Sequence, residues 1–310
     1  MDKINGTLYD IWHEGKIMSI REATVAGSFY AGTKSSLLQQ IEDSFTKGYG
    51  PGKLPENKKG AGSLKGVVVP HAGIPFSGAI AAHSYLAIAE DGFADAFIVM
   101  GPNHRGVGSG VALYPEGKWE TPLGDIVMDA TLIEKLAGGI IDINEASHPF
   151  GENSIEVQMP FLQYIGRKKK FSVALISMAT QDFETANEIG KIIADVIQND
   201  DRRVMIIASS DFSHEGGAYG RLPPNGLTAD EYARKQDQLA IAKILKLDPK
   251  GLISTVYDNN ISMCGYGPVA ALLVAAKKLG ATKAELLKYI TSNDVHPGSF
   301  CVGYGSFNIH

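Results

Sequence analysis

A short apolar run ends in a histidine-bearing turn at Val67-Val68-Val69-Pro70-His71-Ala72-Gly73. Two further apolar runs end in the same way, one in Gly101-Pro102-Asn103-His104 and the other in Ser209-Ser210-Asp211-Phe212-Ser213-His214. Short continuous apolar runs rich in β-branched residues are typical of strands that are buried on both faces of a sheet. The repeated arrangement therefore predicts three buried strands, each with polar residues just beyond its carboxyl end.

Strand-like runs alternate with longer helix-like stretches along the rest of the chain. Strands are expected at 67–69, 96–100, 173–178 and 204–208, and helices at 35–48, 78–89, 184–198, 231–246 and 268–279. This alternation predicts an α/β fold, a single layered α/β/α domain with a mostly parallel or mixed central sheet. Two polar stretches rich in glycine and proline, 50–62 and 215–228, are expected as long surface loops. The second follows a candidate active-site segment and could cover it.

The composition excludes several classes of protein. The chain has 310 residues with 44% hydrophobic and 20% charged residues and a formal net charge of −5, as expected for a globular domain. Without a basic stripe, nucleic acid and anionic membrane are not expected as partners, and no apolar run approaches the ~20 residues of a membrane span. Two cysteines rule out a disulfide framework, so a cytoplasmic location is expected. Residues 1–17 are expected to be an N-terminal extension, with Met18 as an alternative start, ahead of a domain over 18–310.

The histidines beyond the strands can converge, because ligands in α/β sheets bind outside the carboxyl ends of strands. His71 and His104 offer two imidazoles, and Cys264 offers a thiolate just before a glycine turn and a helix that Pro268 begins. A helix N-terminus lowers the pKa of a thiol. Two imidazoles and one thiolate leave coordination positions open, as a catalytic metal requires. The soft thiolate favours copper or zinc without excluding iron. The alternative for the three histidines that follow the strands, His71, His104 and His214, is that they are unrelated turn residues.

Other polar residues join the candidate site. His214 follows Asp211 by three residues, so it is a candidate general base that this carboxylate would orient. The segment 148–158 is expected to begin a helix, on which Glu152 and Glu156 would share one face. They would either contact the substrate or support the ligands, or they would cap the helix on a solvated face. The candidate substrate contacts or ligand supports are Glu152, Glu156, Asn103 and Tyr266.

Taken in order, the motifs resemble the Memo family over residues 18–310. The motifs that carry the resemblance are Arg21-Glu22-Ala23, Ala26-Gly27-Ser28-Phe29-Tyr30, Pro70-His71-Ala72-Gly73, Gly101-Pro102-Asn103-His104, Asn153-Ser154-Ile155-Glu156, Ser209-Ser210-Asp211-Phe212-Ser213-His214 and Cys264-Gly265. The family's prokaryotic members are named after the AmmeMemoRadiSam system, which implies an AMMECR-type protein and a radical SAM protein as partners. The family is similar in fold to the class III extradiol dioxygenases, whose non-haem iron is bound by two histidines and a glutamate. Asn153 stands where the family usually has histidine.

The resemblance implies metal ligands at His71, His104 and Cys264, and it places the catalytic-base histidine of the dioxygenases on His214, with Asp211 beside it. We therefore expect a metal-dependent redox or dioxygenase-like enzyme that uses iron or copper, with zinc as an alternative metal. Its expected substrate is a small molecule, and an aromatic compound is one candidate. Two alternatives stay open. One is a non-catalytic regulatory module that binds a metal or a peptide, and the other is an enzyme with Cys264 as nucleophile.

Overall fold

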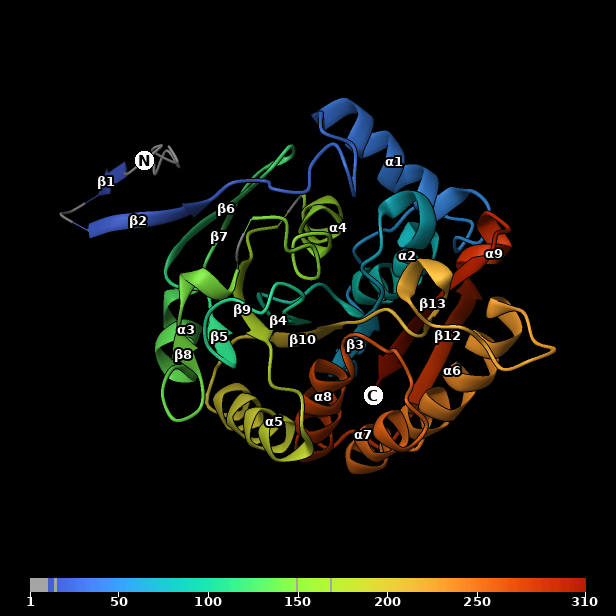
Figure 1. The fold of residues 1–310 in the computed structure, drawn as a ribbon. Coiled ribbons are helices and arrows are strands. Elements are labelled where there is room, and N and C mark those ends of the chain that lie inside the picture. Colours follow the sequence, from blue (N-terminus) through green and yellow to red (C-terminus); the bar gives the residue numbers. More distant parts are fainter. Residues whose placement is uncertain (1–10, 14–15, 149, 168) are drawn as a thin grey trace, which may run out of the picture.

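The computed structural model describes residues 11–13, 16–148, 150–167 and 169–310. A nine-stranded mixed sheet forms its centre, with helices on both faces (Figure 1). The predicted α/β fold with a mixed central sheet is therefore confirmed. Of the expected extension over residues 1–17, residues 1–10, 14 and 15 lie outside the described residues. β1 (Ile11–His13) pairs antiparallel with β2 (Lys16–Arg21).

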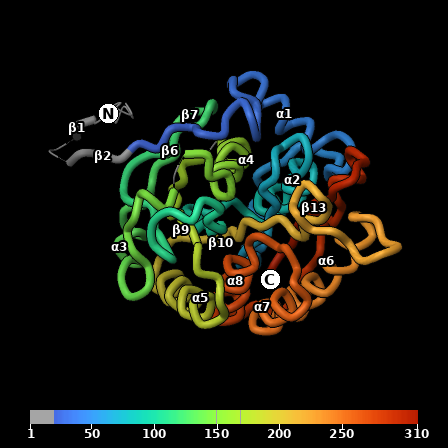
Figure 2. Tube along the Cα trace, viewed as in Figure 1, coloured from blue at the N-terminus to red at the C-terminus, as the bar shows by residue number. Residues whose placement is uncertain are grey.

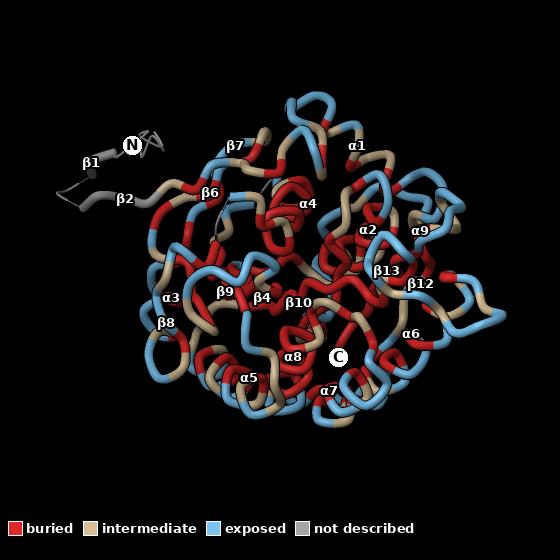
Figure 3. The backbone as a smooth tube through the Cα atoms, viewed as in Figure 1, coloured by how far each residue is buried: buried red, intermediate tan, exposed pale blue. Residues whose placement is uncertain are grey.

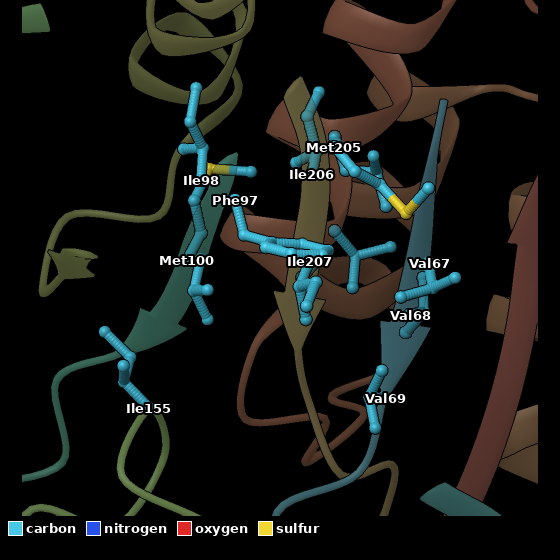
Figure 4. Packing of buried hydrophobic residues seen from close by; sticks show 14 of the residues in the cluster. Val67, Val68, Val69, Phe97, Ile98, Met100, Ile155, Met205, Ile206 and Ile207 are labelled. Carbon is cyan, nitrogen blue, oxygen red and sulfur yellow. The ribbon is translucent and has the colours of Figure 1, made fainter. Parts of the chain in front are cut away.

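Four parallel strands form the middle of the large sheet. They are β3 (Gly66–Val69), β10 (Val204–Ser209), β4 (Ala96–Pro102) and β9 (Ser172–Met178), and they neighbour one another in that order. They correspond to the four strands expected from the sequence. Their apolar side chains pack against one another and against Ile155 (Figure 4). Because the four strands are parallel, their carboxyl ends meet at one edge of the sheet.

Antiparallel strands extend the sheet on both sides. β13 (Phe300–Ile309) pairs antiparallel with β3, with β12 (Ala284–Thr291) and with β11 (His214–Gly216), while β5 (Val111–Leu113) pairs antiparallel with β9 and parallel with β8 (Asp142–Ile143). A second sheet has the order β1-β2-β6-β7, with β6 at Gly117–Thr121 and β7 at Gly124–Val127. The prediction of a loop over 215–228 is wrong at its start, where β11 and a short 3-10 helix, η2 (Gly217–Tyr219), lie. The partner of β11 lies far along the chain, so its pairing leaves no local signal.

Helices cover both faces of the large sheet (Figure 1). α1 (Lys34–Thr46), α2 (Ile74–Asp91) and α4 (Gln158–Gly166) pack together on one face, and α5 (Phe183–Gln198) and α8 (Tyr266–Lys278) pack together on the other. α6 (Ala229–Leu245) lies on β12 and β13, next to α7 (Pro249–Asp258), and the shorter helices are α3 (Ala130–Leu136), α9 (Ser292–Val295) and η1 (Glu145–Ser147). The five expected helices are confirmed. α2 begins earlier than predicted because Pro75 fits the first turn of a helix.

The predicted helix over 148–158 is wrong, because α4 begins only at Gln158. Glu152 and Glu156 precede it, and both are buried, so neither lies on a solvated face. Their carboxylates accept hydrogen bonds from backbone N–H groups elsewhere in the chain, including those of Val25 and His104. Glu152 Oε1 also accepts the N–H of Ser154 at 2.9 Å, and a local bond of this kind competes with helix formation.

Burial follows the layers (Figure 3), with the central strands buried and the outer loops exposed. Residues 50–62 form the expected long loop. Figure 2 shows that α1 (blue) and α2 (teal) lie near the red C-terminal part, whose β13 and α9 contact α2. Within the described ranges, no helix combines the length and the apolar character that a membrane crossing requires.

Candidate metal centre

Three potential ligands meet at the carboxyl edge of the sheet. His71 follows β3, His104 follows β4, and Cys264 lies in the turn before α8. One ligand atom of each residue lies within 4.8 Å of the others. The Sγ atom of Cys264 is 3.1 Å from Nε2 of His71, and the two imidazole centroids are 5.2 Å apart. The structure thus brings together the three residues that the sequence grouped.

Hydrogen bonds on the far side of each ring fix which nitrogen faces the cluster. Ser209 Oγ donates its single hydrogen to the carbonyl of Ser154, so it accepts from Nδ1–H of His71 at 2.9 Å. Nδ1 of His104 donates to Oε1 of Glu152 at 3.0 Å. When either ring is neutral, its Nε2 therefore keeps the lone pair. This is the form in which histidine binds a metal, with its other nitrogen donating to a carboxylate or another oxygen.

Glu152 also anchors the backbone of His104, because its Oε2 accepts the N–H of that residue at 2.7 Å. Burial opposes ionisation of Glu152, but hydrogen bonding and the charge of His104 lower the pKa of its carboxyl to about 2. Burial likewise opposes a charged ring, yet Cys264 and Glu152 raise the pKa of His104 to about 10. Glu152 and Cys264 therefore stabilise positive charge beside His104, which is where a bound metal cation would lie.

Cys264 is held as a thiolate. Burial raises the pKa of its thiol, but the charge of His71 and the hydrogen bonds of both histidines outweigh burial and lower that pKa to about 5. The backbone N–H of Asp211 donates to Sγ at 3.3 Å. A Cβ atom on Gly265 would lie 2.4 Å from a carbonyl oxygen at the end of β10, so glycine lets the turn approach the strand. The thiolate is the form of cysteine that binds metals and attacks electrophiles.

His214 and Asp211 both border the same pocket, but they do not form the predicted pair. The Asp211 carboxylate accepts the backbone N–H groups of His71 at 2.7 Å and Ala72 at 3.3 Å. Nδ1–H of His214 instead donates to the carbonyl of Ser262 at 3.1 Å, and Ser262 Oγ accepts the backbone N–H of His214 at 2.7 Å. The prediction that Asp211 orients His214 is therefore wrong, and Ser262 orients the ring instead. In neutral His214, Nε2 is then the proton acceptor.

A pocket of about 300 Å³ opens beside the cluster. Aromatic rings and small apolar groups form most of its wall. Asn153, which was not among the predicted site residues, lines the pocket and donates to the carbonyl of His71 at 3.0 Å. Tyr219 follows β11, so the 215–228 segment does border the site. The lining residues are Phe29, His71, Ala72, Gly73, Phe76, His104, Asn153, Asp211, His214, Tyr219, Ser292, Phe300, Val302 and Tyr304.

Three predicted contacts lie elsewhere. Asn103 shapes its own turn, since it donates to the carbonyl of Val107. The hydroxyl of Tyr266 contacts that of Tyr257 at 3.2 Å, outside the pocket lining. Glu156 holds the N-terminal segment to the domain. Its carboxylate accepts from Arg21, Thr24, Val25 and Tyr30.

The family model described as Memo-like protein matches residues 21–308. The chain belongs to the Memo family. A MEMO1 family protein of Methanopyrus kandleri is 42% identical over 289 residues, covering 92% of this chain and 97% of that protein. A second, from Methanothermobacter thermautotrophicus, is 39% identical over 291 residues, covering 92% of this chain and 98% of that protein.

A solved structure shares the fold of this chain. The crystal structure of an uncharacterized protein from Escherichia coli K12 matches with a TM-score of 0.55 and 14% identity, over 80% of this chain and 100% of that one. At this identity the likeness concerns the fold alone. The Memo assignment made from the sequence motifs is confirmed by the family model, and the layered α/β fold expected from it agrees with this likeness.

Proposed function

We propose that this Memo-family protein is a metal-dependent, dioxygenase-like enzyme that acts on a small aromatic substrate. The observation that carries the proposal is the convergence of two imidazole Nε2 atoms and one thiolate beside a pocket walled by aromatic rings. Pockets with apolar walls and a few converging polar groups are typical of small-molecule sites. The pocket volume of about 300 Å³ suits a compound with one ring.

The donor set fits a resident metal. His71, His104 and Cys264 would hold it, and Ser209 and Glu152 keep both rings in the ligating tautomer. Two nitrogens and one soft sulfur suit iron or copper, with zinc as an alternative. When bound, iron or copper would supply Lewis acidity and one-electron chemistry at the inner end of the pocket.

The chain's own residues would bind the substrate and move a proton. Nε2 of His214 is the proton acceptor that borders the pocket, since its Nδ1–H is committed to Ser262. An aromatic hydroxyl near His214 would transfer its proton to this nitrogen. Tyr219 contacts the ring of His214 edge-on at 5.2 Å between centroids and limits its movement. The aromatic wall would exclude water from the bound ring.

One observation favours a second function, in which Cys264 acts as a nucleophile without a metal. Its Sγ lies 3.1 Å from Nε2 of His71, and its thiol pKa is lowered to about 5. A cysteine beside a histidine is the usual form of an activated thiol. The two functions exclude each other, because a thiolate that is bound to a metal cannot also attack a substrate as a nucleophile.

Oxygen uptake with a panel of catechols and other phenols tests the proposal. Protein purified without added metal is compared with chelated protein and with protein reloaded with iron or copper. Uptake that chelation abolishes and reloading restores supports the metal enzyme. Stoichiometric alkylation of Cys264 that inactivates metal-free, active protein would instead favour the thiol enzyme.

A further inference from the structure

A second cavity lies next to the metal-site pocket, between α1, α2 and α9. It is an open groove of about 800 Å³. None of the candidate metal ligands or His214 lines it. Its lining residues are Ala31, Ser35, Ser36, Gln39, Gln40, Asp43, Ser44, Lys47, Gly48, Tyr49, Ile74, Pro75, Phe76, Ala79 and Val295.

The groove and the metal-site pocket share the side chain of Phe76. Phe76 is 42% exposed and packs edge-on against the ring of His296, with the centroids 5.5 Å apart. α9 also borders both cavities, through Ser292 on the pocket side and Val295 on the groove side. The two cavities are therefore neighbours on either side of Phe76 and the start of α9.

One wall of the groove carries uncharged hydrogen-bonding groups from α1. Gln40 uses its Oε1 to accept the N–H of Ala31 at 2.8 Å, so its NH₂ group can donate to a ligand. Gln39 uses its Nε2 to donate to Asp43 at 2.8 Å, so its Oε1 can accept. The hydroxyls of Ser35 and Ser36 lie on the same wall. Together they offer both donors and acceptors.

The opposite wall is apolar, with Ile74, Phe76 and Val295. The charged residues in the lining are Asp43 and Lys47, and their side chains pair with each other at 2.9 Å. Among the described lining residues, a charged ligand group would therefore have to displace one member of this pair to gain an ionic partner. A neutral group rich in hydroxyls would satisfy the α1 wall.

We propose that the groove binds a neutral, hydroxyl-bearing extension of the substrate whose ring occupies the metal-site pocket. This rests on the proposed function for the identity of the ring. The groove then determines specificity, because it distinguishes an extended substrate from a bare ring. It also favours neutral extensions over those that end in a carboxylate or an ammonium group, because a charged end would compete with the Asp43–Lys47 pair.

Methyl NMR on the full chain, labelled at alanine, isoleucine and valine methyls, tests the two cavities separately. Ile74, Ala79 and Val295 report on the groove, and Ala72 and Val302 report on the pocket. The probes are catechol, 2-(3,4-dihydroxyphenyl)ethyl β-glucoside, ethyl β-glucoside, and a catechol with a carboxylate at the end of a chain of similar length. We expect the catechol glucoside to shift both sets of methyls and to bind roughly tenfold more tightly than catechol, as one or two added hydrogen bonds would allow.

The substitution Ser36→Trp fills the groove from an exposed position on α1, and Thr46→Trp on the same helix is the matched control because it lies outside the lining. Ser36→Trp should reduce the affinity for the glucoside to that for catechol and leave catechol binding unchanged. A glucoside that shifts only Ala72 and Val302 and binds no better than catechol would overturn the groove proposal alone. Equal binding of the carboxylate probe would overturn its neutral character. If ethyl β-glucoside shifts the groove methyls while none of the three catechol probes shifts the pocket methyls, the groove is supported and the aromatic substrate is contradicted.

Discussion

Nδ1 of His104 lies 3.0 Å from Oε1 of Glu152, a carboxylate that is almost completely buried. Both oxygens of Glu152 are used on His104, one by its ring and one by its backbone. A buried carboxylate in this position raises the basicity of a ligating imidazole and sets its orientation. The contact links a residue beyond β4 to one just before α4.

Replacing Glu152 with glutamine should weaken metal binding. The amide NH₂ of Glu152→Gln would face a hydrogen-bond donor of His104 at one of the two contacts, so the ring would lose its orientation. We expect the metal affinity to fall by roughly 10- to 100-fold. Competition with a chelator measures this affinity. Glu145→Gln, at an exposed position of η1, is the control, and equal affinities of the two variants would refute the role of Glu152.

The buried ion pair between Arg21 and Glu156 should contribute strongly to the free energy of unfolding, because it holds the N-terminal segment to the domain. Both side chains are buried, and their nearest atoms are 2.5 Å apart. Glu156→Ala breaks this buried ion pair and removes the acceptor of Thr24, Val25 and Tyr30, which costs about 3–5 kcal/mol in the free energy of unfolding. Chemical denaturation measures this change. Glu90→Ala, which breaks surface contacts to Lys53 and Lys58, should cost only about 0–1 kcal/mol, and a similar loss in both variants would contradict this account.

His148 should make the fold sensitive to acid. Burial, chiefly, lowers the pKa of its ring to about 3, and its Nε2 donates to the carbonyl of Ala112 at 3.2 Å. In the unfolded chain the ring takes up a proton below about pH 6.5, whereas in the folded chain it stays neutral down to about pH 3. The unfolded state therefore binds more protons in this window, and stability falls as pH falls, by up to about 1.4 kcal/mol per pH unit.

The variant His148→Phe isolates this contribution. Phenylalanine fits between the rings of Tyr114 and Trp119 but cannot titrate. Denaturation of both proteins at several values between about pH 7 and about pH 5 gives two slopes of stability against pH. The slope for wild type should be steeper. Equal slopes would mean that His148 is protonated in the folded protein.

His214 should be required for turnover but not for metal binding. His214→Ala removes the proton acceptor beside the pocket, so turnover should fall by roughly 10²- to 10⁴-fold. Oxygen uptake and elemental analysis on the same sample measure the two properties. Unchanged turnover would exclude His214 as the base, and loss of metal would mean that it supports the ligand cluster instead.

The sequence was sufficient to predict the central strands and the convergence of His71, His104 and Cys264. Continuous apolar runs carry the strand signal, and parallel strands place the residues that follow them at one edge. The partners of these residues were harder to predict. Whether Glu152 contacts His104 or solvent depends on the path of the chain before α4, which its local pattern did not reveal.

The orientation of His214 shows the same limit. Asp211 is close in sequence and was the obvious partner, but its carboxylate is used by the backbone after β3. The actual partner of the ring is the backbone carbonyl of Ser262. Every residue has a backbone carbonyl, so the sequence does not indicate which one the ring contacts. β11 was missed for a related reason, since strand pairing over long separations depends on the assembled sheet.

Elemental analysis of protein purified without added metal and without an affinity tag tests the metal centre most directly. The comparison is with Cys264→Ser and His104→Ala, and Cys301→Ser serves as a control on the other cysteine, which is buried. We expect near-stoichiometric iron or copper in the wild type and in Cys301→Ser, and we expect the metal to be lost in Cys264→Ser and His104→Ala. No metal in the wild type, and no uptake during anaerobic reconstitution, would contradict this expectation.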